Sequence, residues 1–258
     1  MNNLDNILNL YQPVSLEEMS DVSFLRRKDV KYIFHTHKLI PLLHSLHNHY
    51  RILTIEDNQA FRYHTLYLDT PDLKFYHDHH NGVRNRFKIR YRNYMETNET
   101  YLEIKEKNNK EQTDKKRTKV DHLFDVLPPE DIHFILRYLQ IDTSTLKPTL
   151  RTHFTRITFV NTENKERITL DTNLGFEGYS KKTEFPFLVV CEQKLDKSVS
   201  SSYFASLLKS CNIYSSSFSK YCFGMVLLNP SVKSNRFKDK LLSINKLSND
   251  PGIYNIAG

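Results

Sequence analysis

Four cationic side chains alternate along residues 86–92, Arg-Phe-Lys-Ile-Arg-Tyr-Arg. Successive side chains of a strand point to opposite faces, so Arg86, Lys88, Arg90 and Arg92 would share one face, about 6–7 Å apart. The apolar residues between them would share the other face and could pack into a core. Such a row of cations needs acidic neighbours, water or a polyanionic ligand to neutralise it. Taken alone, this strand is most simply interpreted as a solvent-exposed basic face.

Other predicted strands repeat this pattern, with one largely apolar face and one charged face. Charged faces that meet solvent usually mix the two signs, whereas here the cations clearly outnumber the carboxylates. This composition favours a barrel whose interior is a cationic tunnel, although outward charges on a β-sandwich would give the same alternation. The charged positions are Lys31, Arg86, Lys88, Arg90, Glu103, Lys105, Arg156, Arg167, Glu192 and Lys194.

A tunnel of this kind predicts phosphate chemistry. Unpaired charges are costly in a dry interior, so the tunnel must stay wet and bind an anion of high charge density. Arg and Lys bind phosphate oxygens through charge-assisted hydrogen bonds. The few carboxylates suit Mn²⁺ or Mg²⁺, which are hard ions that take oxygen ligands and bridge phosphates.

The elements that must position these residues can be predicted from periodicity and turn signals. Residues 115–120 are either a tunnel strand or a solvated hairpin, residues 73–80 are a short helix or a loop, and Ser15–Glu18 fits a capping box. Because the strand connections are mostly hairpin-like, we expect an α+β fold: an eight-stranded antiparallel β-barrel with flanking helices. Strands are predicted at 28–35, 61–69, 84–94, 101–107, 115–120, 151–160, 166–172 and 185–195, and helices at 38–50, 128–139, 198–211 and 220–228.

Bulk composition is consistent with a soluble cytoplasmic protein. The chain has 258 residues with 37 Lys and Arg against 30 Asp and Glu, and the net charge of +7 favours an anionic partner. No signal peptide and no apolar run of about 20 residues is apparent. Cys191, Cys211 and Cys222 lack metal-site spacing, so we expect reduced, packed thiols. The twelve His residues also lack such spacing, and we expect them at the surface.

Taken in order, the segments resemble the catalytic domain of the vacuolar transporter chaperone (VTC) complex, a polyphosphate polymerase of the triphosphate tunnel metalloenzyme superfamily. The resemblance covers about residues 25–228. It rests on Lys31-Tyr32, Tyr67–Asp69, Lys88–Tyr91, Glu103–Lys105, Arg156 within 151–159, Arg167–Thr172, Glu192–Leu195 and Ser219–Tyr221.

The resemblance implies an enzyme that transfers the terminal phosphoryl group of ATP to a polyphosphate chain with the help of Mn²⁺ or Mg²⁺. It implies that Glu192 holds the metal, and we take Glu103 as a second candidate ligand. Arg86, Lys194 and Ser219 are further candidates for phosphate binding. The residues that would act on the phosphates during transfer are Lys31, Lys88, Arg90, Lys105, Arg156, Arg167 and Lys220.

Two features depart from the fungal members of that family. Position 88 is Lys where they have Arg, which keeps the charge but loses the bidentate geometry. The chain also lacks the phosphate-sensing SPX domain and the membrane helices, so product translocation would need a separate membrane protein. We expect a lead-in at 1–24, the tunnel domain at 25–228 and a basic, flexible C-terminal tail at 229–258.

Two alternatives remain open. With water as the acceptor, the same site would be an inorganic or nucleoside triphosphatase. A non-catalytic sensor of polyphosphate or nucleotides would use the same cations, but it would not need a metal carboxylate, and Glu192 is present. Specific binding of nucleic acid is not expected, because no helix-turn-helix, zinc-finger or RRM motif is found. The sequence does not indicate an oligomeric state.

Overall fold

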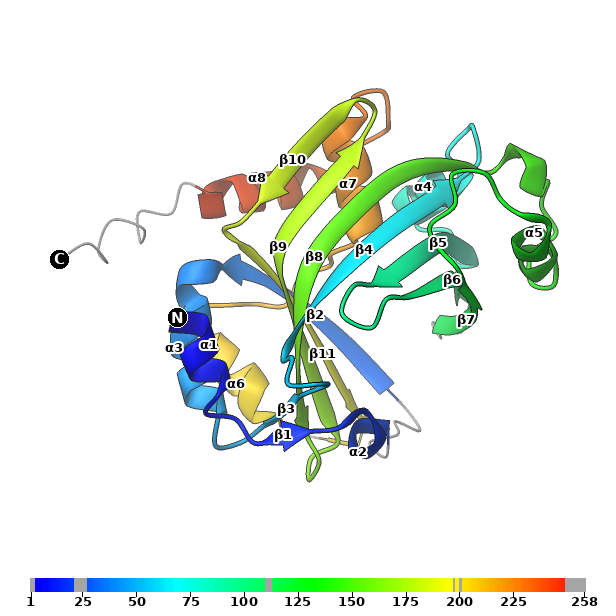
Figure 1. The fold of residues 1–258 in the computed structure, drawn as a ribbon. Helices are drawn as coiled ribbons and strands as arrows, with labels where there is room; N and C mark the ends of the chain where they lie inside the picture. The colour runs from blue at the N-terminus through cyan, green and yellow to red at the C-terminus, as the bar shows by residue number, and fades with distance from the viewer. Residues whose placement is uncertain (1–2, 21–26, 110–112, 197, 200, 249–258) are drawn as a thin grey trace.

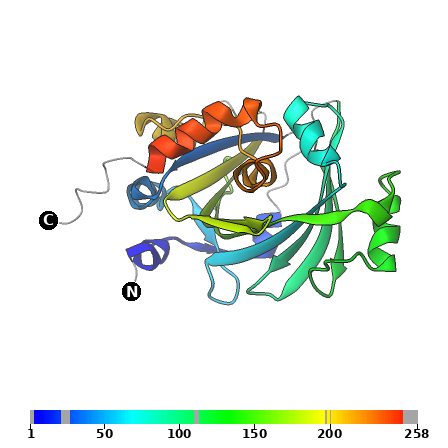
Figure 2. The ribbon, with the colours of Figure 1, turned by 90° about the horizontal axis from the view of Figure 1, so that it is seen from above.

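The structure is a computed structural model that describes residues 3–20, 27–109, 113–196, 198–199 and 201–248. Its centre is an antiparallel path of eight strands, which curls strongly along its length (Figures 1 and 2). In spatial order the strands are β2 (Arg27–His35), β11 (Leu188–Asp196), β9 (Glu166–Gly178), β8 (Lys147–Asn161), β4 (Ala60–Asp69), β5 (Arg86–Tyr94), β6 (Glu99–Lys107) and β7 (Thr113–Val120).

The predicted α+β fold with an eight-stranded, barrel-like antiparallel sheet is confirmed. Within the described residues the end strands β2 and β7 do not pair with each other, so the sheet curves strongly without closing its last seam. Residues 113–120 form β7, an edge strand of the sheet that pairs with β6 and is largely exposed, so it combines features of both alternatives, a tunnel strand and a solvated hairpin.

Three short strands extend the sheet. The pair β1 (Pro13–Val14) and β3 (Arg51–Leu53) is parallel, and β3 also joins the end of β8. Strand β10 (Lys181–Phe185) pairs with β9. The strand predicted at 185–195 is therefore wrong at its start, because Phe185 ends β10 and Leu188 begins β11 after a tight turn.

Helices cover the sheet and its ends. The predicted helix at 38–50 is shorter in the structure, and Pro41 lies in the first turn of α3, where its missing N–H costs nothing. The capping box is confirmed, since Ser15 N–H donates to Glu18 and Glu18 N–H donates to Ser15 Oγ. The helices are α1 (Asn3–Leu8), α2 (Leu16–Ser20), α3 (Leu39–Leu46), α4 (Lys74–Asn81), α5 (Pro129–Leu136), α6 (Tyr203–Ser210), α7 (Lys220–Leu228) and α8 (Lys238–Ser248), with 3₁₀ turns at Thr36–Lys38, Thr143–Thr145 and Asn235–Phe237.

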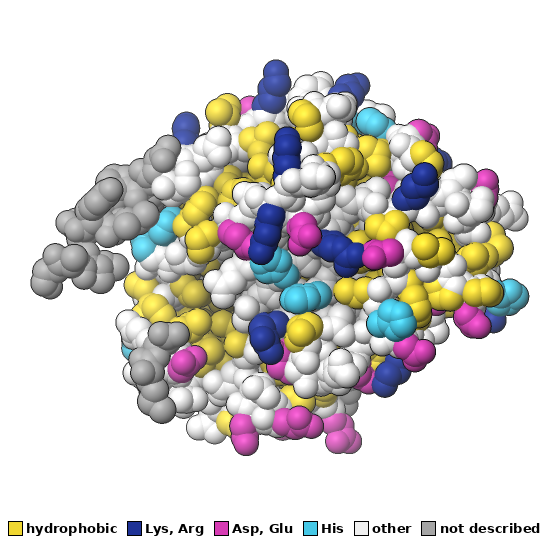
Figure 3. All heavy atoms as spheres, turned by 45° about the horizontal axis from the view of Figure 1, so that its top comes forward, with side chains coloured by type: hydrophobic (Ala, Val, Ile, Leu, Met, Phe, Trp, Pro, Cys, Tyr) yellow, Lys and Arg dark blue, Asp and Glu magenta, His cyan; other side chains and the backbone are white. Residues whose placement is uncertain are grey.

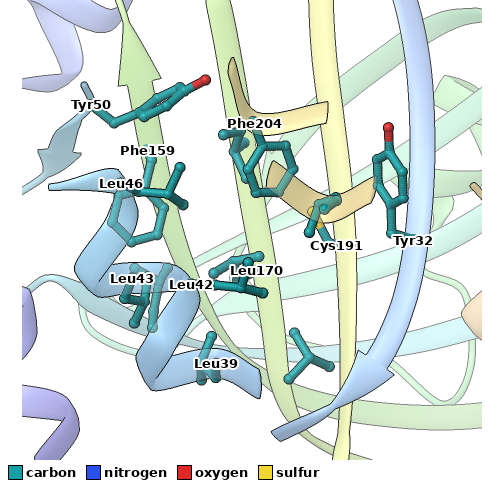
Figure 4. Packing of buried hydrophobic residues seen from close by; sticks show 14 of the residues in the cluster. Tyr32, Leu39, Leu42, Leu43, Leu46, Tyr50, Phe159, Leu170, Cys191 and Phe204 are labelled. Atoms are coloured by element: carbon teal, nitrogen blue, oxygen red, sulfur yellow. The ribbon is translucent and has the colours of Figure 1, made fainter. Parts of the chain in front are cut away.

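Helices α3 and α6 pack on the outer face of β2, β8, β9 and β11 (Figure 4). The leucines of α3 recur at helical spacing, and all four lie buried in this cluster. Full burial of each stabilises the fold by about 1.5–3 kcal/mol. Cys191 projects into the same cluster and Cys222 is also buried, so these thiols pack as predicted.

Helix α7 approaches β8 and β9 unusually closely at Gly224. A Cβ atom at this position would lie 2.6 Å from side-chain atoms of Leu150 and Phe176, so only glycine fits without a shift. This close packing fixes the position of the amino end of α7, where Ser219 and Lys220 lie.

Charges on the outside of the molecule mix both signs. In Figure 3, Lys and Arg side chains lie beside Asp, Glu and His across the visible face. Exposed pairs such as Arg62–Glu96 and Lys182–Glu184 are typical of such a surface.

Two histidines do not follow the surface prediction, because His35 and His80 are only 4% and 2% exposed. The His35 ring stacks on Phe187, and the His80 ring contacts Phe237 edge to face.

None of the helices in the described part of the chain is long and apolar enough to cross a membrane.

Candidate active site

The basic strand β5 presents its cations as the alternation predicts. Ile89 and Tyr91 are fully buried in the core against α5, while Arg90 and Arg92 project to the other side of the sheet. We call this side the inner face. Cross-strand neighbours extend it over the whole sheet, and its charged residues include Asp29, Lys31, Arg86, Lys88, Arg90, Arg92, Glu103, Lys105, Lys115, Arg156, Arg167, Asp171, Glu192 and Lys194.

Arg90 is fixed by a buried carboxylate. Its Nε and Nη2 atoms donate to Glu103 Oε2 at 2.8 and 2.6 Å, and Lys115 donates to the other carboxylate oxygen. Burial opposes ionisation of Glu103, but Arg90, Arg92 and Lys115 outweigh it and hold the pKa of this carboxyl well below its usual range. Both oxygens of Glu103 are therefore occupied, and a metal could bind there only if one of these partners left.

A second buried carboxylate, Asp171, organises the opposite side of the inner face. Arg156 donates to it from Nε at 2.6 Å and from Nη2 at 2.8 Å, and Lys220 donates to the same carboxylate. Burial raises the pKa of Asp171, but Arg156 and Lys220 outweigh it and lower the value to about 2. This cluster joins β8, β9 and the first residue of α7.

Lys88 contacts the amino end of the same helix. Its Nζ donates to Ser219 Oγ at 3.0 Å, and that hydroxyl also accepts a hydrogen bond from Cys222 N–H as the N-cap of α7. Burial, together with the nearby cations Lys31 and Arg90, lowers the pKa of Lys88 to about 8.

Glu192 differs from the other two carboxylates, because it is held loosely. Its oxygens lie 3.3 Å from Lys31 Nζ and 3.5 Å from Lys194 Nζ, and 21% of its side chain is exposed. Burial opposes its ionisation, but Lys194, Lys31 and Arg156 hold its pKa well below its usual range. Glu192 is thus an ionised and accessible carboxylate surrounded by cations.

Lys105 faces this carboxylate across the inner face. Its pKa lies well below the usual range, first because of Arg90 and then because of burial and Arg92. Across the described residues, Lys105 forms no ion pair. Arg167 lies opposite Lys194 in the register of β9 and β11. The cations in this part of the inner face outnumber the carboxylates that could neutralise them. This excess of positive charge favours the binding of an anion.

The donor set fits one hard divalent ion shared with a phosphate ligand. The described residues contain no group of three His, Cys, Asp or Glu side chains that could hold a metal by themselves. Mg²⁺, however, is usually bound by one or two carboxylates together with substrate phosphates and water. Glu192 is accessible enough to serve in this way, whereas Glu103 and Asp171 are occupied by Arg and Lys donors.

The residues predicted for the site come together on the inner face, with Ser219 and Lys220 added from α7. Sequence reasoning did not include Asp171, Arg92 and Lys115 among the site residues. Strand alternation had already placed Arg92 on the cationic face of residues 86–92, and it could also have found Asp171, since Asp171 follows Arg167 by four residues. Lys115 could have been found only by knowing that β7 pairs with β6.

Lys88 and Arg90 should respond differently to removal of their charge. We expect Arg90→Met to lower the free energy of unfolding by about 3 kcal/mol, because it leaves the buried Glu103 undercompensated. Lys88→Met should keep or raise the stability, since burial disfavours the ammonium group. Thermal unfolding at pH 7 checks both variants, and equal losses would contradict this assignment.

The pH dependence of the Lys88 effect follows from its pKa, which burial lowers from 10.5 to about 8. Below pH 8 the ammonium is protonated in both the folded and the unfolded chain, so the folded state carries the full cost of burying it. Above pH 10.5 both states are neutral and this cost disappears. The stability advantage of Lys88→Met over the wild type should therefore shrink as the pH rises from 8 to 10.5.

Comparison with solved structures gives several similar folds at low sequence identity. A proposed adenylate cyclase from Bacillus halodurans is 13% identical, with a TM-score of 0.49 over 83% of this chain and 100% of that one. One from Vibrio parahaemolyticus is 11% identical, with a TM-score of 0.46 over 76% and 96%. A proposed adenylyl cyclase from Hippeastrum, described as having a dominant triphosphatase activity, is 14% identical, with a TM-score of 0.46 over 77% and 94%.

No curated protein matches the sequence significantly. A family model described as the VTC domain matches residues 26–229, which include all eight strands of the central path and helix α7. The match therefore covers every residue of the inner face and both residues that α7 contributes to it. The chain belongs to the VTC domain family.

Proposed function

We propose that the protein is a metal-dependent polyphosphate polymerase that transfers the terminal phosphoryl group of ATP to a polyphosphate chain on the inner face. Membership of the VTC domain family supports the proposal. The observation that carries it is the cation-rich inner face with an ionised, accessible carboxylate, Glu192, among its cations. The cations can bind the phosphates of a nucleoside triphosphate, and the Glu192 carboxylate can bind a divalent ion.

The cations would share the work of phosphoryl transfer. This reaction mainly requires positioning and stabilisation of the charge on the transferring group. Arg90 and Arg156 are oriented by buried carboxylates, so their guanidinium groups are preorganised to hold phosphate oxygens with defined geometry. Lys88 and Lys105 have no carboxylate partner among the described residues, and they would supply the uncompensated positive charge. Lys31, Arg167 and Lys220 would hold the remaining phosphates.

Glu192 would hold Mn²⁺ or Mg²⁺ together with phosphate oxygens. When bound, such an ion supplies further charge neutralisation at the phosphates. Lys31 and Lys194 keep Glu192 ionised, and their ion-pair distances of 3.3 and 3.5 Å are long enough for them to move toward a phosphate instead. No side chain needs to act as a base if the attacking group is an ionised phosphate oxygen.

Incubation with ATP and Mn²⁺ or Mg²⁺ should produce a ladder of polyphosphate on a gel, together with ADP. The cationic inner face should retain the growing anion, so long chains should accumulate. A reaction started with inorganic tripolyphosphate as a primer should show no lag.

Two outcomes would contradict this function. Release of inorganic phosphate without a ladder would assign the same site to a triphosphatase. Neither product with any metal or primer would leave a non-catalytic sensor of polyphosphate or nucleotides. Glu184→Gln, on the exposed strand β10, serves as the control variant and should behave like the wild type.

A further inference from the structure

A cavity of about 330 Å³ opens beside the candidate active site. Strands β2, β5 and β6 form one side of it, and α4, the segment before α7 and α8 form the other. Its polar lining comes mainly from Lys31, His79, Arg86, Lys107, Ser219 and Lys240. Helix α8 lies beyond residues 26–229, so Lys240 is supplied by a segment that the family model does not cover.

The lining is strongly cationic. Four lysine and arginine side chains face one carboxylate, that of Asp29, among the lining residues. Arg86 and Lys107 have no carboxylate within ion-pair distance in the part of the chain that the structure describes. Lys240 is partly buried and donates to Ser216 Oγ. Charge of this kind on the wall of a cavity favours an anionic ligand.

A neutral hydrogen-bonding group also lines the cavity. The Nδ1 atom of His79 is buried and has no hydrogen-bond partner among the described residues. Burial, reinforced by Lys88 and Arg86, lowers the pKa of this histidine to about 2, so the ring is neutral. A buried polar atom without a partner is uncommon in a folded protein.

The cavity is continuous with the candidate active site through two shared side chains. Lys31 lines the cavity and also lies 3.3 Å from Glu192. Ser219 lines the cavity and also accepts the hydrogen bond from Lys88. An anion in the cavity would therefore lie next to the phosphates held on the inner face.

Phosphate suits this cavity better than a nucleobase does. The aromatic rings in its lining are already packed against the protein: Phe218 and Phe223 are 8% and 3% exposed, and Phe237 contacts Tyr76 and His80. Phe218 and Phe223 therefore offer a base little ring surface to stack on, while Ser217, Lys107 and Lys240 bring hydroxyl and ammonium donors to the lining.

We propose that this cavity holds the terminal phosphates of the polyphosphate acceptor, and that Lys240 and Lys107 are acceptor-binding residues. The inference rests on the proposed polymerase function. A terminal oxygen of the acceptor would attack the γ-phosphorus of ATP and form a new P–O bond. The bond from that phosphorus to the β,γ-bridging oxygen would break, and its electron pair would leave with ADP. A phosphate whose second pKa lies near 6 is largely ionised at neutral pH, so no proton needs to be transferred.

The test uses Lys240→Gln in the full chain, with Lys238→Gln as the matched control on the exposed side of the same helix. We expect Lys240→Gln to raise the KM for inorganic tripolyphosphate as primer about tenfold, the scale of one charge-assisted hydrogen bond. The KM for ATP and the turnover at saturating primer should not change. Lys107→Gln, on a different element, should have the same effect. An unchanged primer KM in both variants, or an equal effect of Lys238→Gln, would overturn the proposal.

A binding experiment separates this inference from the proposed function. With the inner face saturated by β,γ-imido-ATP, calorimetry should detect tripolyphosphate binding to the wild type and about tenfold weaker binding to Lys240→Gln. If the wild type binds no tripolyphosphate under these conditions, the acceptor site does not exist. If it binds tripolyphosphate in this way but never elongates it, the polymerase function is wrong, and the cavity is a phosphate site with another role.

Discussion

Turnover of the Glu192→Gln variant is expected to fall by at least about 10²-fold, the scale seen when one electrostatic contributor to a transition state is removed. Glutamine keeps the size of the side chain but removes the charge that a hard divalent ion requires. Binding of triphosphate without metal should persist, because it depends on the cations. It should even become tighter, since a carboxylate that repels phosphate is lost. The measurement is a pair: steady-state turnover with Mn²⁺ or Mg²⁺, and triphosphate affinity in EDTA.

The matched control is Glu103→Gln. Both glutamates have a lysine two residues later on the same strand face, but Glu103 is fully buried and bonded to Arg90 and Lys115. We therefore expect Glu103→Gln to lower the melting temperature far more than Glu192→Gln does. Normal turnover by Glu192→Gln would show that Glu192 only pairs with the lysines, and the metal ligand would then have to be sought at Glu103 or Asp29.

Most of the fold could be predicted from the sequence because its elements are strongly periodic. The alternation along β5 and the leucine spacing of α3 each define a buried face without any tertiary information. Predictions were wrong where turns interrupt a uniform pattern. Residues 181–195 have strand character throughout, yet a two-residue turn divides them into β10 and β11.

The roles of the site carboxylates could not be sorted in the same way. Glu103-Ile104-Lys105 and Glu192-Gln193-Lys194 are the same local pattern, so no propensity distinguishes them. The difference between the two glutamates comes from the residues beside them on the neighbouring strands. Glu103 pairs in register with Arg90 and also accepts a hydrogen bond from Lys115 of β7, whereas Glu192 pairs in register with Lys31 and Thr169. One carboxylate is therefore enclosed by donors and the other remains accessible, a difference that depends on strands distant in sequence.

Removing the charge of Asp171 is the second change with a large expected effect, a loss of stability. We expect Asp171→Asn to lower the free energy of unfolding by about 3–5 kcal/mol, because it leaves Arg156 and Lys220 as buried cations without a counter-ion. At this chain length that loss corresponds to a decrease in melting temperature of roughly 10 °C. The exposed pair Arg151–Asp125 offers a matched control, and Asp125→Asn should change stability by less than about 0.5 kcal/mol.

The pH dependence of this effect follows from the pKa of Asp171, which is lowered from 3.8 to about 2. A carboxylate whose pKa is lower in the folded state contributes stability above the pKa of the unfolded state. This contribution is lost as the pH falls through the folded value. The difference between the wild type and Asp171→Asn should therefore be complete at pH 7 and decrease only below about pH 4.

Triphosphate should rescue the Asp171→Asn variant. An anion bound on the inner face would supply the negative charge that Arg156 and Lys220 have lost, so its binding should be tighter and should raise the melting temperature more in the variant than in the wild type. Differential scanning calorimetry with and without inorganic tripolyphosphate, in EDTA, measures both shifts. If the two shifts are equal while the variant is strongly destabilised, Arg156 and Lys220 do not contact the ligand, and the phosphates must be held by the cations of β5 and β6 alone.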